Sequence, residues 1–176
     1  MSCFLCRCFT WIGSDCLCEK LFLTINIHVS LFRIRPQIVR EKLELCRVCT
    51  AVTPGEPQIT IGDDRSFTYD CVFDQDTHQQ LVYDRCVRSL IEGTLEGFNA
   101  TVLAYGQTGS GKTYTMGTAF DMTTASDDDS VGIVPRAMEH LFTLIEQRKR
   151  EARERGFIEP IFDVAVQFIE VVFCLH

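Results

Sequence analysis

The chain has 176 residues and a formal net charge of −7, from 17 lysines and arginines against 24 aspartates and glutamates. Hydrophobic residues make up 46% and charged residues 23%, proportions typical of a folded globular chain, which excludes a disordered or low-complexity protein. The length allows one domain or a piece of one, and the acidic balance argues against a nucleic-acid partner. No apolar run reaches the roughly 20 residues that span a bilayer, so no membrane segment is expected.

Residues 1–32 form a cysteine-rich leader in which no repeating pattern predicts a helix or strand. Five of the ten cysteines lie here: Cys3, Cys6, Cys8, Cys16 and Cys18. Charged residues interrupt the leader, unlike a signal peptide, so we expect no secretion and a cytoplasmic protein with reduced thiols. Four of these cysteines could surround a zinc ion, but their irregular spacing makes that the weaker interpretation.

Short strands are expected from residue 33 onward. Residues 33–36 could close a strand, and the apolar residues 48–52 precede a strong turn signal at residues 54–57. The spacing Cys46-x-x-Cys49 also occurs in redox sites. We expect this pair to lie on a strand, without the helix start that would lower a thiol pKa.

A hairpin and a long helix are expected next. Residues 58–61 and 66–69 flank the polar loop 62–65, which predicts two strands joined by a tight turn. Thr77-x-x-Gln80 fits a capping box that opens a single helix lasting until Gly97. Its apolar residues repeat at helical spacing: Val82, Tyr83, Cys86, Val87, Leu90 and Ile91.

The second half of the chain alternates strands and helices. Residues 100–105 form a short apolar run typical of a strand buried on both faces. Residues 118–130 read as a solvated loop, whose acidic residues Asp127, Asp128 and Asp129 are better explained as solubilising than as a cation site.

A second helix is expected between Pro135 and Gly156, because proline suits a first turn and glycine a helix end. Its inner face would hold Met138, Leu141, Leu144 and Ile145, and basic residues near its end would stabilise the helix dipole. Residues 162–168 alternate as a strand does. The order of strands, helix, strand, helix and strand predicts the α/β class.

Gly106-Gln107-Thr108-Gly109-Ser110-Gly111-Lys112-Thr113 matches the phosphate-binding pattern G-x-x-x-x-G-K-[ST] between a predicted strand and a helix start. Glycines let the backbone curl so that successive N–H groups point into one hollow that can hold phosphate oxygens. Lys112 would reach the β- and γ-phosphates, and the Thr113 hydroxyl would bind Mg²⁺. A chance match in a glycine-rich turn is the weaker alternative.

Together with its flanks, residues 97–116, this loop resembles the kinesin motor domain. Three other segments agree with that family in order and spacing: Arg33-Ile34-Arg35-Pro36, residues 67–73 and residues 132–137. The segment at residues 53–57, with Arg40-Glu41-Lys42, is most similar to the fourth kinesin group.

The resemblance implies a P-loop NTPase fold, with a kinesin-like sheet flanked by helices and truncated after about half of the motor domain. It implies binding of ATP and Mg²⁺ by residues 106–113 and Tyr114, with Thr113 on the metal and with Arg33, Arg35 and Pro36 against the adenine. A guanidinium plane and a rigid ring can both pack on a base. The complete motor would hydrolyse ATP and move along microtubules, as part of the cytoskeleton.

The resemblance covers residues 33–170 and leaves out both the leader and residues 171–176, a divergent tail. The sequence lacks the Asn-x-x-Ser-Ser-Arg and Asp-Leu-Ala-Gly segments with which kinesins sense the γ-phosphate, so binding is expected more readily than hydrolysis. The negative charge argues for weak or no microtubule binding. The alternative to a motor is therefore a truncated, non-motile nucleotide-binding fragment.

A further expectation concerns the stability of the folded chain. In kinesins the strand before the P-loop lies between strands from later in the chain, so here that strand should have two open edges. We expect a partly folded or aggregation-prone product.

Overall fold

The computed structural model describes residues 4–12, 29–62, 64–117 and 128–173. They fall into two compact units, Ile27–His78 in one and Met1–Asn26 with Gln79–His176 in the other. Within the described ranges, no helix has the length and apolar character needed to cross a membrane.

The unit Ile27–His78 is made of short strands and one short helix. Its elements are β2 (Leu31–Arg33), α1 (Val39–Leu43), β3 (Thr50–Val52), β4 (Gln58–Ile61), β5 (Arg65–Thr68) and β6 (Cys71–Phe73). Strands β2 and β6 pair in parallel, and β3, β4 and β5 form an antiparallel sheet in that order.

Both turns of the antiparallel sheet were predicted correctly. At the turn between β3 and β4, Gly55 has a φ of 80°, and the Thr53 N–H donates to the Gln58 carbonyl at 3.0 Å. Between β4 and β5, Gly62 has a φ of 71°, a conformation that favours glycine. The expected hairpin is therefore confirmed.

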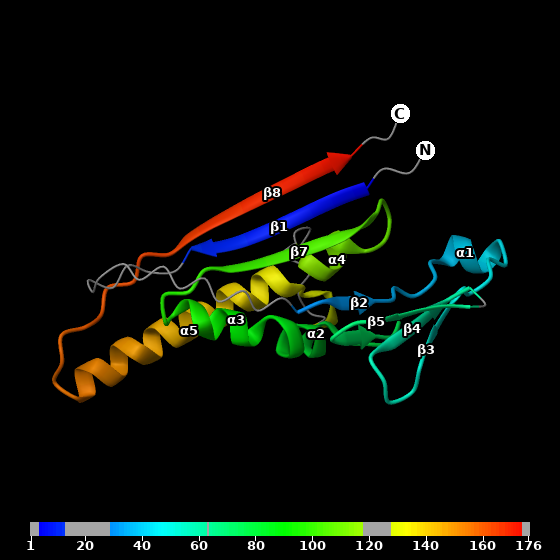
Figure 1. The fold of residues 1–176 in the computed structure, drawn as a ribbon. Coiled ribbons are helices and arrows are strands. Elements are labelled where there is room, and N and C mark those ends of the chain that lie inside the picture. The colour runs from blue at the N-terminus through cyan, green and yellow to red at the C-terminus, as the bar shows by residue number, and fades with distance from the viewer. Residues whose placement is uncertain (1–3, 13–28, 63, 118–127, 174–176) are drawn as a thin grey trace. The chain divides into compact units, whose positions relative to one another are not determined.

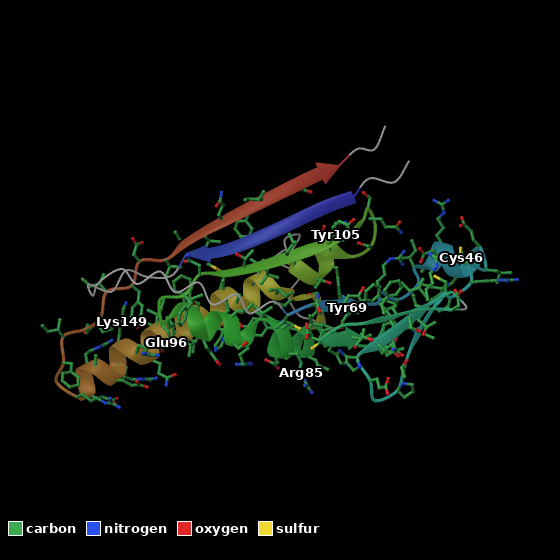
Figure 2. All side chains as sticks on the ribbon, viewed as in Figure 1. Cys46, Tyr69, Arg85, Glu96, Tyr105 and Lys149 are labelled. Atoms are coloured by element: carbon green, nitrogen blue, oxygen red, sulfur yellow. The ribbon has the colours of Figure 1, made fainter. Side chains whose placement is uncertain are left out.

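The prediction that Cys46 and Cys49 lie on a strand is wrong. Both lie in the loop between α1 and β3, after Leu45, which has a left-handed φ of 53°. Figure 2 shows Cys46 at this end of the unit. Both thiols are exposed and free.

The other unit holds a three-stranded antiparallel sheet and its helices. Its elements are β1 (Phe4–Ile12), α2 (Gln79–Cys86), α3 (Arg88–Thr94), β7 (Ala100–Gln107), α4 (Lys112–Met116), the 3₁₀ turn η1 (Asp128–Ser130), α5 (Ile133–Glu154) and β8 (Ala165–Phe173). The sheet order is β7-β1-β8. Figure 1 shows the three strands side by side; α3 and α4 contact β7, and α5 contacts α2, α3 and α4.

The central strand of this sheet comes from the cysteine-rich leader, where no element was predicted. Strand β1 pairs with β7 from Trp11 opposite Ala100 to Phe4 opposite Gln107. Its other edge pairs with β8 over its whole length. The expectation that the strand before the glycine-rich loop has two open edges is therefore wrong, because β1 occupies one of them.

Strand β7 is covered on one face only, which corrects the prediction of a strand buried on both faces. Its residues alternate between covered and exposed, and the outward-facing Leu103 and Tyr105 keep 59% and 67% of their surface accessible. Helices α3 and α4 contact β7, and Figure 2 labels Tyr105 on this strand. Alternation of this kind is typical of an antiparallel strand with one solvated face.

The expected single helix over residues 77–97 is two helices. Helix α2 ends at Cys86, and α3 begins after Val87, whose φ of −121° departs from helical geometry. The Val87 N–H donates to the Tyr83 carbonyl at 2.9 Å and the Ile91 N–H donates to the Val87 carbonyl at 3.1 Å, so Val87 is the junction at which one helix ends and the next begins. The predicted apolar face is largely confirmed by the buried residues Val82, Tyr83, Cys86, Val87 and Ile91.

Helix α5 confirms the second predicted helix and its end. Leu141 and Ile145 are buried as expected. At its C-terminus Gly156 has a φ of 70°, its N–H donates to the Arg153 carbonyl, and the Phe157 N–H donates to the Ala152 carbonyl. These two hydrogen bonds form a Schellman motif, which satisfies carbonyls that the helix leaves unpaired.

Candidate functional site

The glycine-rich loop connects β7 to α4, as the sequence predicts. Gly109 and Gly111 have φ values of 81° and 94°, which side chains other than glycine's rarely adopt. A Cβ on Gly106 would lie 2.6 Å from the Ser110 Oγ and 3.3 Å from the Ser110 Cβ, so a side chain there would displace Ser110. The loop therefore favours glycine for two steric reasons, positive φ at Gly109 and Gly111 and a close approach at Gly106.

Lys112 lies at the mouth of this loop. Its Nζ donates to the carbonyls of Gly106 and Gln107, each at 2.7 Å. The cation therefore sits against the backbone of the loop's first two residues rather than extending into solvent. The next residue, Thr113, is half-buried on the first turn of α4.

The loop offers backbone donors. The Ser110 N–H closes a turn onto the Gln107 carbonyl at 3.1 Å. Within the described ranges, the N–H groups of Gly109 and Gly111 donate to no backbone carbonyl. Free N–H groups on a curled glycine-rich backbone suit the oxygens of a phosphate.

Three hydrogen bonds that sequence reasoning missed link α4, α2 and η1 to one another. The Gln79 side-chain amide donates to the Tyr114 carbonyl at 2.8 Å, and the Tyr114 hydroxyl donates to the Asp129 carbonyl at 2.8 Å. The Gln79 N–H donates to the Asp129 carboxylate at 3.0 Å. Only the acidic run in the sequence hinted at Asp129.

The predicted capping box at the start of α2 is replaced by this arrangement. Asp129, rather than Thr77, binds the first N–H of α2. The Gln80 side chain donates to the Asp84 carboxylate at 2.9 Å and accepts a hydrogen bond from Arg136, so it does not reach back to Thr77. Asp129 thus has a structural role beyond the solubility that was predicted for it.

The end of α4 meets the start of α5 at two glycines. A Cβ on Gly132 would lie 2.5 Å from the Gly117 Cα and 2.7 Å from the Met116 carbonyl carbon. A Cβ on Gly117 would lie 2.8 Å from the Gly132 Cα. The two backbones therefore touch, and both positions require glycine.

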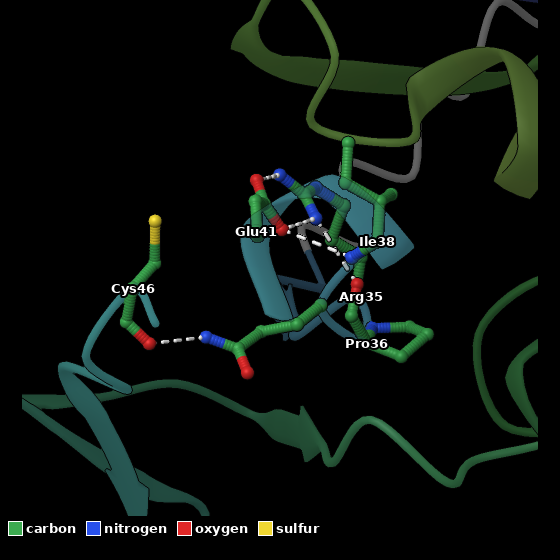
Figure 3. A network of polar contacts seen from close by, with 6 residues as sticks. Arg35, Pro36, Ile38, Glu41 and Cys46 are labelled. Carbon is green, nitrogen blue, oxygen red and sulfur yellow. Dashed lines mark hydrogen bonds and ion pairs between the residues drawn. The ribbon is translucent and has the colours of Figure 1, made fainter. Parts of the chain in front are cut away.

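The residues expected to contact adenine belong to the other unit, so we describe them there. The Arg33 guanidinium donates to the Thr77 carbonyl at 3.1 Å. Arg35 binds both carboxylate oxygens of Glu41 and donates to the carbonyl of Pro36, whose own ring is exposed (Figure 3). Arg35 is therefore already ion-paired within its own unit.

Glu41 also accepts the Ile38 N–H at 3.0 Å, which caps α1. The hydrogen bonds from Arg35 and from the Ile38 backbone lower the pKa of Glu41 to about 2. The carboxylate therefore stays charged at all ordinary pH values and keeps Arg35 in place.

A partly buried polar pair joins α2 to α5 away from the loop. The Tyr83 hydroxyl and the His140 Nδ1 lie 2.7 Å apart, and the Arg88 guanidinium lies 5.7 Å from the centre of the Tyr83 ring. Burial raises the pKa of Tyr83 to about 12. Burial, and then the charge of Arg88, lower the pKa of His140.

Potential metal ligands do not cluster within the part of the chain that the structure describes. Among the described residues, no group of three or more His, Cys, Asp or Glu side chains is placed to hold a metal ion. The four thiols of the zinc interpretation lie outside the described side chains, as does Asp127 of the acidic run.

Most of the chain is similar to proteins of one known family. Residues 33–173 match the model of the kinesin motor domain. The chain is 60% identical over 139 residues to the human kinesin-like protein KIF21B, 58% identical over 145 residues to klp-12 of Caenorhabditis elegans, and 48% identical over 124 residues to the human chromosome-associated kinesin KIF4A. The matches cover 79%, 82% and 70% of this chain but only 8%, 9% and 10% of those proteins.

Two solved structures share the fold. One is the Drosophila kinesin family member Kin10/NOD with divalent manganese and ADP, with a TM-score of 0.53 and 26% identity over 68% of this chain and 38% of that one. The other is NOD docked with bovine tubulin in a nucleotide-free microtubule complex, with a TM-score of 0.54 and 25% identity over 70% and 40% of the two chains. The mixed α/β fold is that of part of a kinesin motor domain, and the resemblance to the fourth kinesin group is confirmed.

Proposed function

Because the chain belongs to the kinesin motor-domain family, we propose that its glycine-rich loop binds the phosphates of Mg²⁺-ATP. The observation that carries this proposal is the loop between β7 and α4, whose glycine conformations leave the Gly109 and Gly111 N–H groups available. A relative of the same fold was solved with manganese and ADP. The donor set therefore suits a nucleoside phosphate with a divalent cation.

Individual residues have distinct parts in the proposed site. Lys112 donates to two carbonyls at the loop's mouth and would exchange those contacts for β- and γ-phosphate oxygens. Thr113 would supply a hydroxyl ligand to Mg²⁺, and the ion would offset negative charge on the phosphates. Tyr114 follows on the same helix. Arg33, Arg35 and Pro36 would lie against the adenine, with Arg35 oriented by Glu41.

For the complete protein we propose a microtubule-based motor that hydrolyses ATP in the cytoplasm as part of the cytoskeleton. NOD, which shares the fold, was docked with tubulin on the microtubule. The chain spans about a tenth or less of the length of the curated relatives that it matches, so motility is proposed for the longer protein.

For the 176 residues themselves we propose nucleotide binding without hydrolysis. The γ-phosphate-sensing segments of kinesins are not among these residues. Hydrolysis needs a positioned water and stabilisation of the developing charge, which Lys112 and Thr113 supply only in part.

The test is binding of Mg²⁺-ATP to the full chain by isothermal titration calorimetry. We expect saturable binding at one site, its loss in Lys112→Ala, and no change in the control Lys149→Ala, whose exposed amine pairs with Glu146 on α5. Equal binding by Lys112→Ala and wild type would refute the loop as the site. Phosphate release stimulated by microtubules would refute the proposal that these 176 residues bind ATP without hydrolysing it.

A further inference from the structure

We propose that Gln79 and Asp129 are positioning residues for the glycine-rich loop, because they hold helix α4 in the orientation that presents Lys112 and Thr113. This inference rests on the proposed function, since the loop is taken to bind nucleotide phosphates. Both residues contact Tyr114 in the middle of α4, Gln79 through its side-chain amide and Asp129 through its backbone carbonyl, while the Asp129 carboxylate holds the Gln79 N–H.

Helix α4 needs such support because it is only five residues long, Lys112–Met116. Isolated helices shorter than about 12 residues are marginal in water, since nucleation costs more than a single turn returns. The helix ends at once, at Gly117, which has a φ of 76°. The orientation of α4 must therefore come from contacts with other elements.

Gln79 provides one of these contacts from the first residue of α2. It is 1% exposed, and its side-chain amide donates to the Tyr114 carbonyl at 2.8 Å. A polar side chain this deeply buried costs free energy unless its hydrogen bonds are made. Burial therefore favours the one placement of α4 in which the Tyr114 carbonyl meets the amide.

Asp129 completes a closed circuit of three elements. Its carboxylate accepts the Gln79 N–H at 3.0 Å, and its carbonyl accepts the Tyr114 hydroxyl at 2.8 Å. A carboxylate at the first turn of a helix is also favoured by the helix dipole. Asp129 thus binds both Gln79 and Tyr114. If any one of these three residues shifts, at least one hydrogen bond of the circuit breaks.

The other end of α4 is fixed by the backbone contact of Gly117 with Gly132. Between that contact and the circuit at Tyr114, α4 is held in its middle and at its C-terminus, while its first turn carries the loop. When only a fraction of molecules has the competent loop, the apparent dissociation constant rises by the inverse of that fraction. Loss of the Gln79 amide should therefore weaken nucleotide binding without removing any group that contacts the nucleotide.

The test compares Gln79→Met with Gln147→Met in the full chain. The control removes an exposed side-chain amide that donates to Glu151 on α5, so the chemical change is the same. We expect Gln79→Met to raise the dissociation constant for Mg²⁺-ADP about tenfold. It should also speed hydrogen exchange at Thr115 and Met116 in the nucleotide-free chain, and Gln147→Met should do neither.

A second pair of variants keeps the inference testable if Gln79→Met does not fold. Asp129→Asn retains an acceptor for the Gln79 N–H and should bind Mg²⁺-ADP almost as wild type does, whereas Asp129→Ala should be weakened about as much as Gln79→Met. Wild-type affinity and wild-type exchange in the folded Gln79→Met and Asp129→Ala variants would overturn the inference. If the wild-type chain binds no Mg²⁺-ADP, the proposed function fails, and the exchange comparison alone decides whether Gln79 positions α4.

Discussion

Gly132→Ala should destabilise the chain through one steric contact. The backbone of Gly132 has a φ of −86°, which alanine adopts without strain, so the added methyl group is the whole perturbation. That methyl would lie 2.5 Å from the Gly117 Cα and 2.7 Å from the Met116 carbonyl carbon. Carbon atoms in contact prefer a separation of about 3.5 to 4.0 Å, so α4 and α5 must move apart by about 1 Å.

The size of the effect follows from this overlap. Overpacking of one methyl group typically costs about 1 to 3 kcal/mol. For a chain of this length each kcal/mol lowers the melting temperature by about 2 to 4 °C, so we expect a fall of about 2 to 12 °C. The contact lies in backbone atoms at both sides, which leaves no flexible side chain to move out of the way.

Gly93→Ala is the matched control. Gly93 lies inside α3, and a Cβ there would have only Phe98 Cδ2 near it, at 4.0 Å. Alanine in a helix interior is favoured over glycine by about 0.5 to 1 kcal/mol, so this variant should melt slightly higher than wild type. Thermal unfolding followed by circular dichroism measures both. A Gly132→Ala variant that melts at or above the wild-type temperature would refute the close contact of α4 with α5.

Two further predictions concern other parts of the fold. Stability should fall as the pH drops below about 6.5, because burial holds the His140 pKa under its usual 6.5 and the unfolded chain then binds the extra proton. His140→Gln keeps an acceptor for Tyr83 and should reduce the change in unfolding free energy between pH 7 and pH 5, measured by chemical denaturation at each pH. The same change in His140→Gln and in wild type would exclude His140 as the cause. Cys8 in β1 lies opposite Leu103 of β7 and Ile169 of β8, and Cys8→Pro removes its backbone N–H. Hydrogen exchange in the strand that loses this hydrogen bond should speed at least about fivefold, whereas Cys8→Ser should leave the exchange unchanged. Equal exchange in the two Cys8 variants would mean that β1 does not pair as described.

Local signals in the sequence predicted local structure well. The hairpin at Gly62, the end of α5 at Gly156 and the loop at residues 106–113 were all recognised, because each depends on glycines at positions that the backbone demands. The apolar face around Val82 was also recognised from its helical spacing. In each case the determining residues are neighbours in the chain.

Features that depend on distant partners were missed. Strand β1 gains its structure from β7 and β8, more than 80 residues away, so its own residues carry no turn or capping signal. Asp129 acts on Gln79, which is 50 positions away, and an acidic run alone does not reveal that contact. The exposed face of β7 was also missed, because an apolar run predicts burial whether or not a second layer exists to cover it.

Helix α5 can act as a lever. Its 22 residues, at 1.5 Å each, make a rod about 33 Å long that starts at Gly132, where it touches the end of α4. If α4 turns α5 by about 5° at that end, the far end near Arg155 moves by about 3 Å. A sub-ångström rearrangement at the glycine-rich loop would thus be read out as a larger displacement beyond Glu154, where a spectroscopic label on an exposed residue would detect it.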